Sequence, residues 1–489
     1  MIATAEQLGC FSGSTELQYA AAEGSTRRQA PPLNLRTEDH VLKTSARKRL
    51  ISNSRDLRRN FALAGWVIRK HLDYVASFEF QMQTPNKKFN AAVEKLMKRW
   101  SKPNCDVSGR FTLRKMLRLL ESKAVLDGDA GFMKVAQFRN GKRFPKLQGI
   151  EGDRLMNPDK PKDPDRWEKG IKVDSAYRHQ AYGIGRRTRN GRLELERVVT
   201  ASRMVWHNGY VENFDQIRGI SPLAPGLNTM RDTYEGFDYA LARMKIAQLF
   251  AFKITRKMEQ LEEEAGGYGL KTATDEDEET GESKKYEVDF GRGPAFLDLD
   301  PGDDAAFLES AQPSDQFQSF TMHAIQMSLK ALDIPFSFYS EDFTNFFGSR
   351  GALMHYERSC SDRRETLQEI LRQITIWLLQ IWIIDGDLEL PKGWTIGDLE
   401  FYWNSVGIPW WDPAKEIKGD LMAIKAGLDT PQRICKERGR GDFYENLEEL
   451  KKAKDAAEDL GLELSFDAPG EAKPKPAKEG EDDADDDEE

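Results

Sequence analysis

The chain has 489 residues, of which 39% are hydrophobic and 31% are charged, so it is polar for a globular protein of its length. Its net charge is -9, and nine of its acidic residues lie in residues 479–489, so the rest holds 72 acidic and 72 basic residues (81 less nine, and 72). A body that is formally neutral argues against a tight duplex-DNA binder, because such proteins usually present a net basic face.

Cysteine usage and hydropathy exclude a disulfide scaffold and a membrane-spanning helix. The four cysteines are far apart, and no pair has metal-ligand spacing: Cys10, Cys105, Cys360 and Cys435. We therefore expect no disulfide framework and synthesis in a reducing cytosol. The N-terminus lacks the basic and apolar regions of a secretory signal, and the best apolar run, 374–384, is too short to span a membrane.

The first half of the chain is predicted to be mixed α and β. Residues 1–45 contain few large apolar side chains and are predicted to form a mobile arm. Three segments have apolar residues near helical spacing and are predicted to be helices: 46–75, 90–100 and 111–126. The turn residues Asn140-Gly141 predict a hairpin over 131–150, and 193–206 is strand-like.

The middle of the chain predicts two helices with a different kind of segment between them. The first helix opens near Pro222 and runs to about Met258, and the second covers 314–332. Residues 259–285 are acidic and Gly-rich, and 286–299 alternate like short strands. We therefore expect two helices that flank a small β-rich insertion.

The last third predicts a long helix followed by short ones. Residues 350–384 should form a helix roughly 50 Å long, charged in its first half and broadly apolar in its second. An aromatic segment, 394–411, precedes short helices from Pro413 to about Leu460. From residue 467 the chain is rich in Pro and Lys and then purely acidic, which predicts a disordered tail.

Motifs for catalysis and cofactor binding are absent from the sequence. Gly141-Lys142 lacks the upstream Gly and the following Ser or Thr of a phosphate-binding loop, which a packaging ATPase would need. The six histidines are scattered, with no two at ligand spacing. We therefore predict a protein without catalytic residues, metal or cofactor.

One carboxylate cluster keeps an enzymatic alternative open. Asp298, Asp300, Asp303 and Asp304 are close in sequence, and clustered carboxylates can hold two metal ions for phosphoryl transfer. The Pro-Gly pair among them is more typical of a turn with solvated acids. A metal-dependent nuclease therefore remains the alternative to a structural protein.

An aromatic loop at 334–350 is the most unusual local feature. Its rings Phe343, Phe346 and Phe347 precede Gly348-Ser349 and a helix that opens at Arg350. Such rings can stack on exposed bases, pack between subunits or against a helix, or project into a channel. The sequence leaves the choice between packing and projection open.

Seven motifs in order resemble signatures of the lambda-type portal proteins of tailed phages. They are Ser54-Arg55-Asp56-Leu57-Arg58-Arg59-Asn60, Leu126-Asp127-Gly128-Asp129-Ala130-Gly131-Phe132, Arg218-Gly219-Ile220-Ser221-Pro222-Leu223-Ala224, Ile334-Pro335, Asn345-Phe346-Phe347-Gly348-Ser349-Arg350, Trp411-Asp412-Pro413 and Gly427-Leu428-Asp429-Thr430. Each is weak alone, whereas their order and spacing over residues 46–462 are fairly specific. The chain departs from the pattern at Phe347-Gly348, where the family has two serines, in the acidic insertion 262–284 and in the acidic tail.

The resemblance implies an α+β, predominantly helical portal fold with wing, stem, clip, tunnel loop and crown, assembled as a twelve-subunit ring. The expected divisions are a mobile arm 1–45, wing 46–225, stem helix 226–258, clip 259–312, second stem helix 313–332, tunnel loop 333–352, wing 353–411, crown 412–466 and acidic tail 467–489. The tunnel-loop candidates are Phe343, Thr344, Asn345, Phe346, Phe347, Ser349 and Arg350, and the clip candidates are Lys284, Lys285, Tyr286 and Arg292.

The function implied is a shaped channel at one head vertex. Double-stranded DNA would pass through it without sequence specificity during packaging and ejection, and a neutral or acidic bore would let DNA slide. The expected partners are the terminase large subunit, head-completion and tail connector proteins, and the major capsid and scaffolding proteins during procapsid assembly. The chain would be made in the host bacterial cytoplasm and end in the virion. A coat or scaffolding protein is the second alternative.

Overall fold

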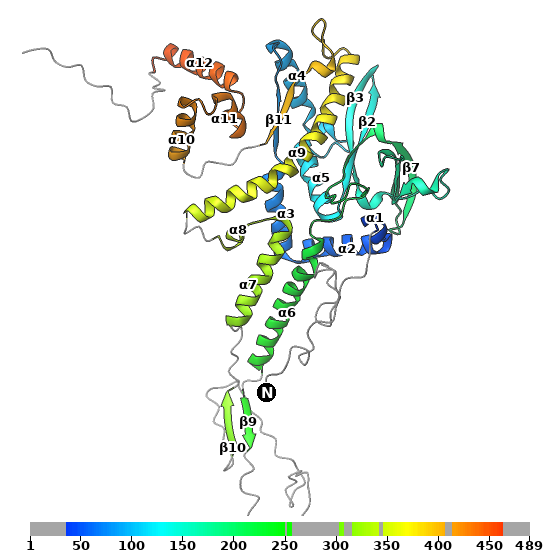
Figure 1. Cartoon of the computed structure of the whole chain (residues 1–489), viewed down its shortest axis with the longest axis vertical. Helices are drawn as coiled ribbons and strands as arrows, with labels where there is room; N and C mark the ends of the chain where they lie inside the picture. The colour runs from blue at the N-terminus through cyan, green and yellow to red at the C-terminus, as the bar shows by residue number, and fades with distance from the viewer. Residues whose placement is uncertain are drawn as a thin grey trace, which may run out of the picture.

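The computed structural model describes residues 36–249, 252–256, 303–307, 315–341, 346–405 and 413–462. Their helices and strands form a mixed α/β body, with two helices that project from it and a group of three short helices near its other side (Figure 1). More residues lie in helices than in strands, as expected for an α+β, predominantly helical chain. Short 3-10 turns lie at Pro103–Cys105, Gly152–Arg154, Pro164–Arg166, Ala201–Arg203, Ala224–Gly226, Lys330–Leu332 and Ile396–Asp398.

The N-terminal helices cover one side of the body. They are α1 (Glu38–Val41), α2 (Thr44–Asn60) and α3 (Ala62–Val75). The prediction of a single helix over 46–75 is wrong, because Phe61 is extended (φ -112°, ψ 113°) and separates α2 from α3. Its ring is buried and lies 5.4 Å from that of Tyr234, so packing decides the break. Residues 38–45, predicted to be part of a mobile arm, instead form α1 and the start of α2.

Two further predicted helices are confirmed, and capping explains their starts. They are α4 (Lys87–Trp100) and α5 (Leu113–Asp127). The side chain of Asn86 accepts a hydrogen bond from the backbone N–H of Phe89, and that of Thr112 accepts one from Lys115. Helix α5 ends at Gly128, whose φ of 96° favours glycine.

Two antiparallel sheets complete the body. One has the order β3-β2-β8, and the other β4-β5-β6-β7. Their strands are β2 (Ala130–Arg139), β3 (Lys142–Glu151), β4 (Trp167–Glu168), β5 (Ile171–Val173), β6 (His179–Arg187), β7 (Leu193–Thr200) and β8 (Met204–His207). The hairpin prediction is confirmed, because β2 and β3 pair through Asn140 and Gly141, both at positive φ. The single strand expected over 193–206 is divided between the two sheets.

Two helices run side by side away from the body and carry a two-stranded pair beyond their far ends (Figure 1). These elements are α6 (Leu227–Leu249), β9 (Phe252–Arg256), β10 (Asp303–Phe307) and α7 (Asp315–Leu329). Strands β9 and β10 pair antiparallel, with Asp303 opposite Arg256. The prediction that the first helix continues to Met258 is wrong, because 252–256 are a strand. The second helix is confirmed.

The longest helix passes diagonally through the body and supplies much of its core (Figure 1). It is α9 (Phe346–Ile384), which follows α8 (Phe336–Ser340) and begins four residues before the predicted Arg350. One face of its second half is buried, with Leu367, Leu371 and Ile374 fully inaccessible to solvent. Within the described residues, no helix combines the length and apolar content needed to cross a membrane.

Strand pairing and the last helices close the described chain. Strand β1 (Phe78–Met82) pairs antiparallel with β11 (Phe401–Ser405), so distant segments meet beside α9. The predicted short helices are confirmed as α10 (Pro413–Lys425), α11 (Pro431–Glu437) and α12 (Phe443–Asp459). Thr430 caps α11 by accepting a hydrogen bond from the backbone N–H of Arg433.

Candidate functional site

Three of the seven sequence motifs meet at one buried point, which we call the motif junction and define as Arg47, Arg55, Asp127, Asp129 and Arg218. Arg55 of α2 donates from Nε to Asp127 Oδ1 at 2.8 Å. Arg218, before α6, donates from Nε to Asp129 Oδ2 at 2.6 Å, and Arg47 donates from Nη2 to Asp129 Oδ1 at 3.1 Å. The junction therefore joins α2, the end of α5 and the segment that leads into α6.

Backbone contacts in the motif junction require glycine. A Cβ on Gly128 would overlap the carbonyl of Gly219, and a Cβ on Gly219 would overlap the carbonyls of Gly128 and Asn208. Two hydrogen bonds tie the same segments together: Arg47 Nη1 donates to Gly219 O at 2.6 Å, and Ser221 Oγ donates to Val125 O at 2.6 Å. The Arg-Gly-x-Ser-Pro and Asp-Gly-Asp motifs thus mark two segments of the chain that are in direct backbone contact.

The two carboxylates of the junction are fully buried but respond differently. Burial alone would raise the pKa of Asp129, but the charges of Arg218 and Arg47 lower it below its ordinary value. Burial raises the pKa of Asp127, although Arg55 and Lys123 oppose this. Burial and the charge of Arg218 lower the pKa of Arg47 to about 10. Paired charges in a dry site hold a geometry, and breaking one pair leaves its partner uncompensated.

A second buried polar group lies between α3, α5 and β8. Glu121 accepts from His71 Nε2 and His207 Nε2, each at 2.9 Å, and the hydroxyl of Tyr210 donates to it at 3.4 Å. Burial alone would raise the pKa of Glu121, but these hydrogen bonds and the histidine charges hold it well below its usual range. Within the described residues, no group of His, Cys, Asp or Glu could hold a metal ion. We call this group the Glu121 cluster.

Helix α9 contacts the Glu121 cluster through a cation–π pair. The guanidinium of Arg363 lies 3.7 Å from the ring centroid of Tyr210. The ring of Tyr356, also on α9, is buried and packs edge-on against Tyr74 at 5.1 Å. The first half of α9 is rich in charged residues, but it also packs on the body through these specific contacts.

The structure places only part of the predicted tunnel loop. Ser349 is buried and Arg350 exposed in the first turns of α9, and Phe346 and Phe347 begin that helix. Phe343, Thr344 and Asn345 lie outside the described residues, as do the clip candidates Lys284, Lys285, Tyr286 and Arg292. The motif junction and the loop candidates are separate groups, and the roles of the loop and clip candidates stay predictions.

The carboxylates of the enzymatic alternative are also divided. Asp298 and Asp300 lie outside the described residues. Asp303 and Asp304 belong to β10, where they pair opposite Arg256 and Thr255 of β9. Their backbone therefore belongs to a regular strand ladder, and the alternative gains no further residue from the structure.

Some residues that complete the motif junction carried no sequence signal. Asp39 of α1 is buried and accepts from the backbone N–H of Ile217 at 2.6 Å, beside Arg218. Lys169, in the turn between β4 and β5, lies 3.3 Å from Asp39. Neither residue belongs to a motif in the sequence, and contacts across more than 100 residues cannot be read from local spacing.

Comparison with known proteins identifies a family for this chain. A family model described as "Phage portal protein, lambda family" matches residues 26–364. No curated protein matches the chain. A solved chain titled "Neck of empty GTA particle computed with C6 symmetry" is 14% identical, with 79% of this chain and 93% of that chain covered and a TM-score of 0.48. One titled "Virion of native gene transfer agent (GTA) particle" is 14% identical, with 81% and 99% covered and a TM-score of 0.44.

Proposed function

The chain belongs to the lambda family of phage portal proteins, and from that premise we propose how its elements divide the work of a portal subunit. It is a structural subunit of a phage head portal. We propose that α6 and α7 are the stem, that the region around β9 and β10 is the clip, and that the mixed α/β body with α9 is the wing. The tunnel loop would lie before α9, and α10 to α12 would form the crown.

One observation carries the stem assignment: the projecting helices expose large apolar side chains along their length. On α6, Phe237 and Leu241 are 43% and 46% exposed and four residues apart, so they share a face. On α7, Phe320 and Met327 are 72% and 67% exposed and seven residues apart. These exposed apolar side chains do not stabilise a monomer, whereas neighbouring copies in a ring would bury them.

The bases of the same helices are anchored within one subunit. Leu227 and Met230 of α6, and Ile325 and Leu329 of α7, are buried in the main core. The motif junction fixes the segment that enters α6, through Arg218 and Ser221. The stem would therefore be rigid at its base and completed by neighbours further out, as a channel wall needs.

The partners follow from this arrangement as proposals. Copies of the chain would form a ring, with twelve as the number that the family resemblance implies. Double-stranded DNA would pass through the centre, the clip would contact the terminase large subunit and later the connector proteins, and the assembly would reside at the head vertex of the virion. The balance of 72 acidic and 72 basic residues outside 479–489 supports a bore that does not grip phosphate strongly.

The mass and shape of the purified assembly test the proposal. A ring of twelve 55.8 kDa chains would weigh about 670 kDa (12 × 55.8) and show a central hole in electron micrographs. Native mass spectrometry together with micrographs of the same sample would give both. A monodisperse monomer or dimer at micromolar concentration would contradict the ring and return attention to the Asp298 carboxylates.

A further inference from the structure

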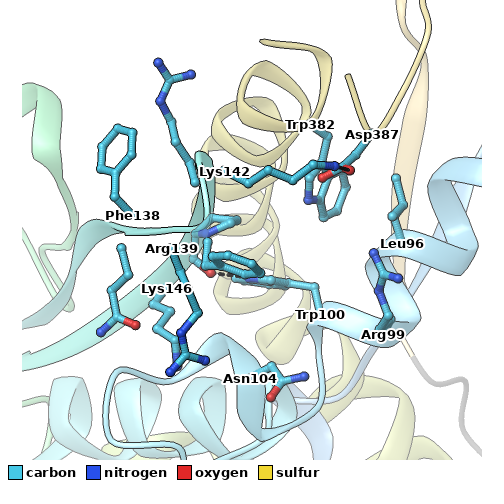
Figure 2. Close-up of a pocket in the computed structure, with 14 residues that line it drawn as sticks. Leu96, Arg99, Trp100, Asn104, Phe138, Arg139, Lys142, Lys146, Trp382 and Asp387 are labelled. Atoms are coloured by element: carbon cyan, nitrogen blue, oxygen red, sulfur yellow. Dashed lines mark hydrogen bonds and ion pairs between the residues drawn. The ribbon is translucent and has the colours of Figure 1, made fainter. Parts of the chain in front are cut away.

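A basic cleft lies at the tip of the β2–β3 hairpin, away from the stem and the motif junction. It has a volume of about 910 Å³ and is walled by the hairpin tip, the C-terminal end of α4 and the end of α9 (Figure 2). Its lining includes the basic residues Arg99, Arg139, Lys142, Arg143 and Lys146, and a single carboxylate, Asp387. We call this the hairpin cleft.

Intramolecular pairs neutralise only part of the charge of the hairpin cleft. Lys142 reaches across to Asp387, as Figure 2 shows, and Arg143 Nη1 lies 3.2 Å from Asp385 Oδ1. In the described part of the chain, no carboxylate forms an ion pair with Arg99 or Arg139, and both are exposed. The cleft therefore keeps a surplus of cations that face solvent.

The cleft is a rigid surface and not a loose loop. Trp100 is buried at its floor and donates from Nε1 to the carbonyl of Pro145 at 2.7 Å, which fixes α4 to β3 (Figure 2). Phe138 stands exposed on the hairpin, with the guanidinium of Arg143 5.5 Å from its ring centroid. A surface array of cations suits an acidic peptide strand.

We propose that the hairpin cleft binds the acidic C-terminal segment of this chain, residues 479–489. That segment carries nine acidic residues and no basic one, which complements the unpaired cations of the cleft. The rest of the chain is balanced at 72 acidic and 72 basic residues, so 479–489 is the strongest concentrated negative charge available to it. Docking there would cover the basic surface and keep other polyanions from it.

The chain is long enough for this contact within one subunit. Glu448 of α12 pairs with Lys87 at the start of α4, and the cleft lies at the other end of α4, about 20 Å away for a helix of 14 residues. Leu462, the last described residue, is at most about 20 Å along the helix direction from Glu448. Sixteen residues lie between Leu462 and Glu479, and this stretch can span up to about 55–60 Å, so the segment can reach the cleft.

Zero-length cross-linking of the full-length assembly tests this contact. A carbodiimide joins carboxylates to amines in direct ion contact, and trypsin cleavage after Lys478 isolates residues 479–489 as one peptide. We expect this peptide to be cross-linked to Lys142 or Lys146, and not above background to Lys160, an exposed lysine that does not line the cleft. Equal yields at all three lysines would overturn the proposal.

Charge reversal supplies the matched comparison. Arg99→Glu with Arg139→Glu keeps both cleft lysines but removes the unpaired cations, so we expect the cross-link yield to fall about tenfold. Arg186→Glu with Arg189→Glu makes the same charge change at the β6–β7 hairpin and should leave the yield unchanged. An unchanged yield in the cleft variant, with circular dichroism like that of the wild type, would overturn the proposal.

Nucleic acid is the competing occupant that the same variants identify. If the segment covers the cleft, a 20-base-pair duplex should bind the full-length chain weakly, and the cleft variant should bind it no differently. Tight binding of the duplex to the wild type that is lost in the cleft variant, without cross-links from 479–489, would make the cleft a nucleic-acid site and overturn the proposal. Neither result depends on whether the chain forms a ring.

Discussion

The motif junction and the proposed stem, α6 and α7, place polar and apolar side chains in opposite ways. The junction buries Arg47, Arg218 and two aspartates and leaves Arg55 partly exposed, whereas the proposed stem exposes Phe320 and Met327 to solvent. Buried charges are tolerated because every one of them has a partner within the same chain. The exposed apolar residues of α6 and α7 have no such partner in the described subunit, so the proposed stem is the part that a neighbouring copy would complete.

Three of the family motifs lie at the motif junction, at the base of α6. The Arg-Gly-x-Ser-Pro, Asp-Gly-Asp and Ser-Arg-Asp motifs all supply residues to the junction and none to the stem surface. These motifs supply the contacts that attach the start of α6 to the body. The exposed apolar residues of α6 and α7, which would contact neighbouring copies, belong to none of the seven motifs, so the motifs do not reveal them.

The largest effect is expected from removing one carboxylate of the junction. Asp129→Ala would leave Arg47 and Arg218 buried without their common partner, which should cost about 3–5 kcal/mol of unfolding free energy. Chemical denaturation would measure it. Asp165→Ala, at an exposed aspartate, should change stability by less than about 0.5 kcal/mol. Equal effects at both positions would show that the junction does not hold the fold.

The next largest loss of stability is expected from adding a Cβ at Gly128. Gly128→Ala adds a Cβ at a φ of 96° that overlaps the carbonyl of Gly219, so we expect a loss of roughly 3 kcal/mol or more. Gly141→Ala has a similar positive φ of 78° but meets open space at the hairpin tip, and should cost only about 1 kcal/mol. Thermal or urea unfolding of the two variants separates close contact from backbone strain alone.

The Glu121 cluster should make stability depend on pH. Because its folded pKa lies below the ordinary Glu value, ionised Glu121 stabilises the fold above a pH of about 4.3, and this contribution is lost as the pH falls through the lower folded value. Glu121→Gln should therefore cost about 2 kcal/mol at pH 7 and progressively less below pH 4. Urea unfolding of both proteins across this range gives the difference. A cost that grows on acidification would contradict the assignment.

The smallest effect on the stability of an isolated subunit is expected from substitutions on the exposed surface of the proposed stem. Phe320→Ser with Met327→Ser should change the stability of an isolated subunit by less than about 0.5 kcal/mol, because both side chains are already exposed. Assembly should suffer, and native mass spectrometry should show fewer rings. Phe214→Ser, at a fully exposed ring of a body loop, should change neither quantity. Normal assembly of the double variant would remove these side chains from the subunit interface.

Local sequence determined many elements of this protein because their causes are local. The hairpin at Asn140-Gly141, the caps at Asn86, Thr112 and Thr430, and the helix α9 follow from turn residues, capping oxygens and apolar spacing. The membership of the family was also readable, since ordered motifs persist in the linear chain.

Only the tertiary structure decided how those motifs are used. Phe61 breaks a continuous helical pattern because its ring packs on Tyr234 of α6, which lies far away in sequence. Residues 252–256 become a strand because 303–307 pair with them. The motif junction joins Arg47, Asp129 and Arg218, which are 82 and 89 residues apart in sequence. Such pairing depends on burial and charge balance that no local window contains.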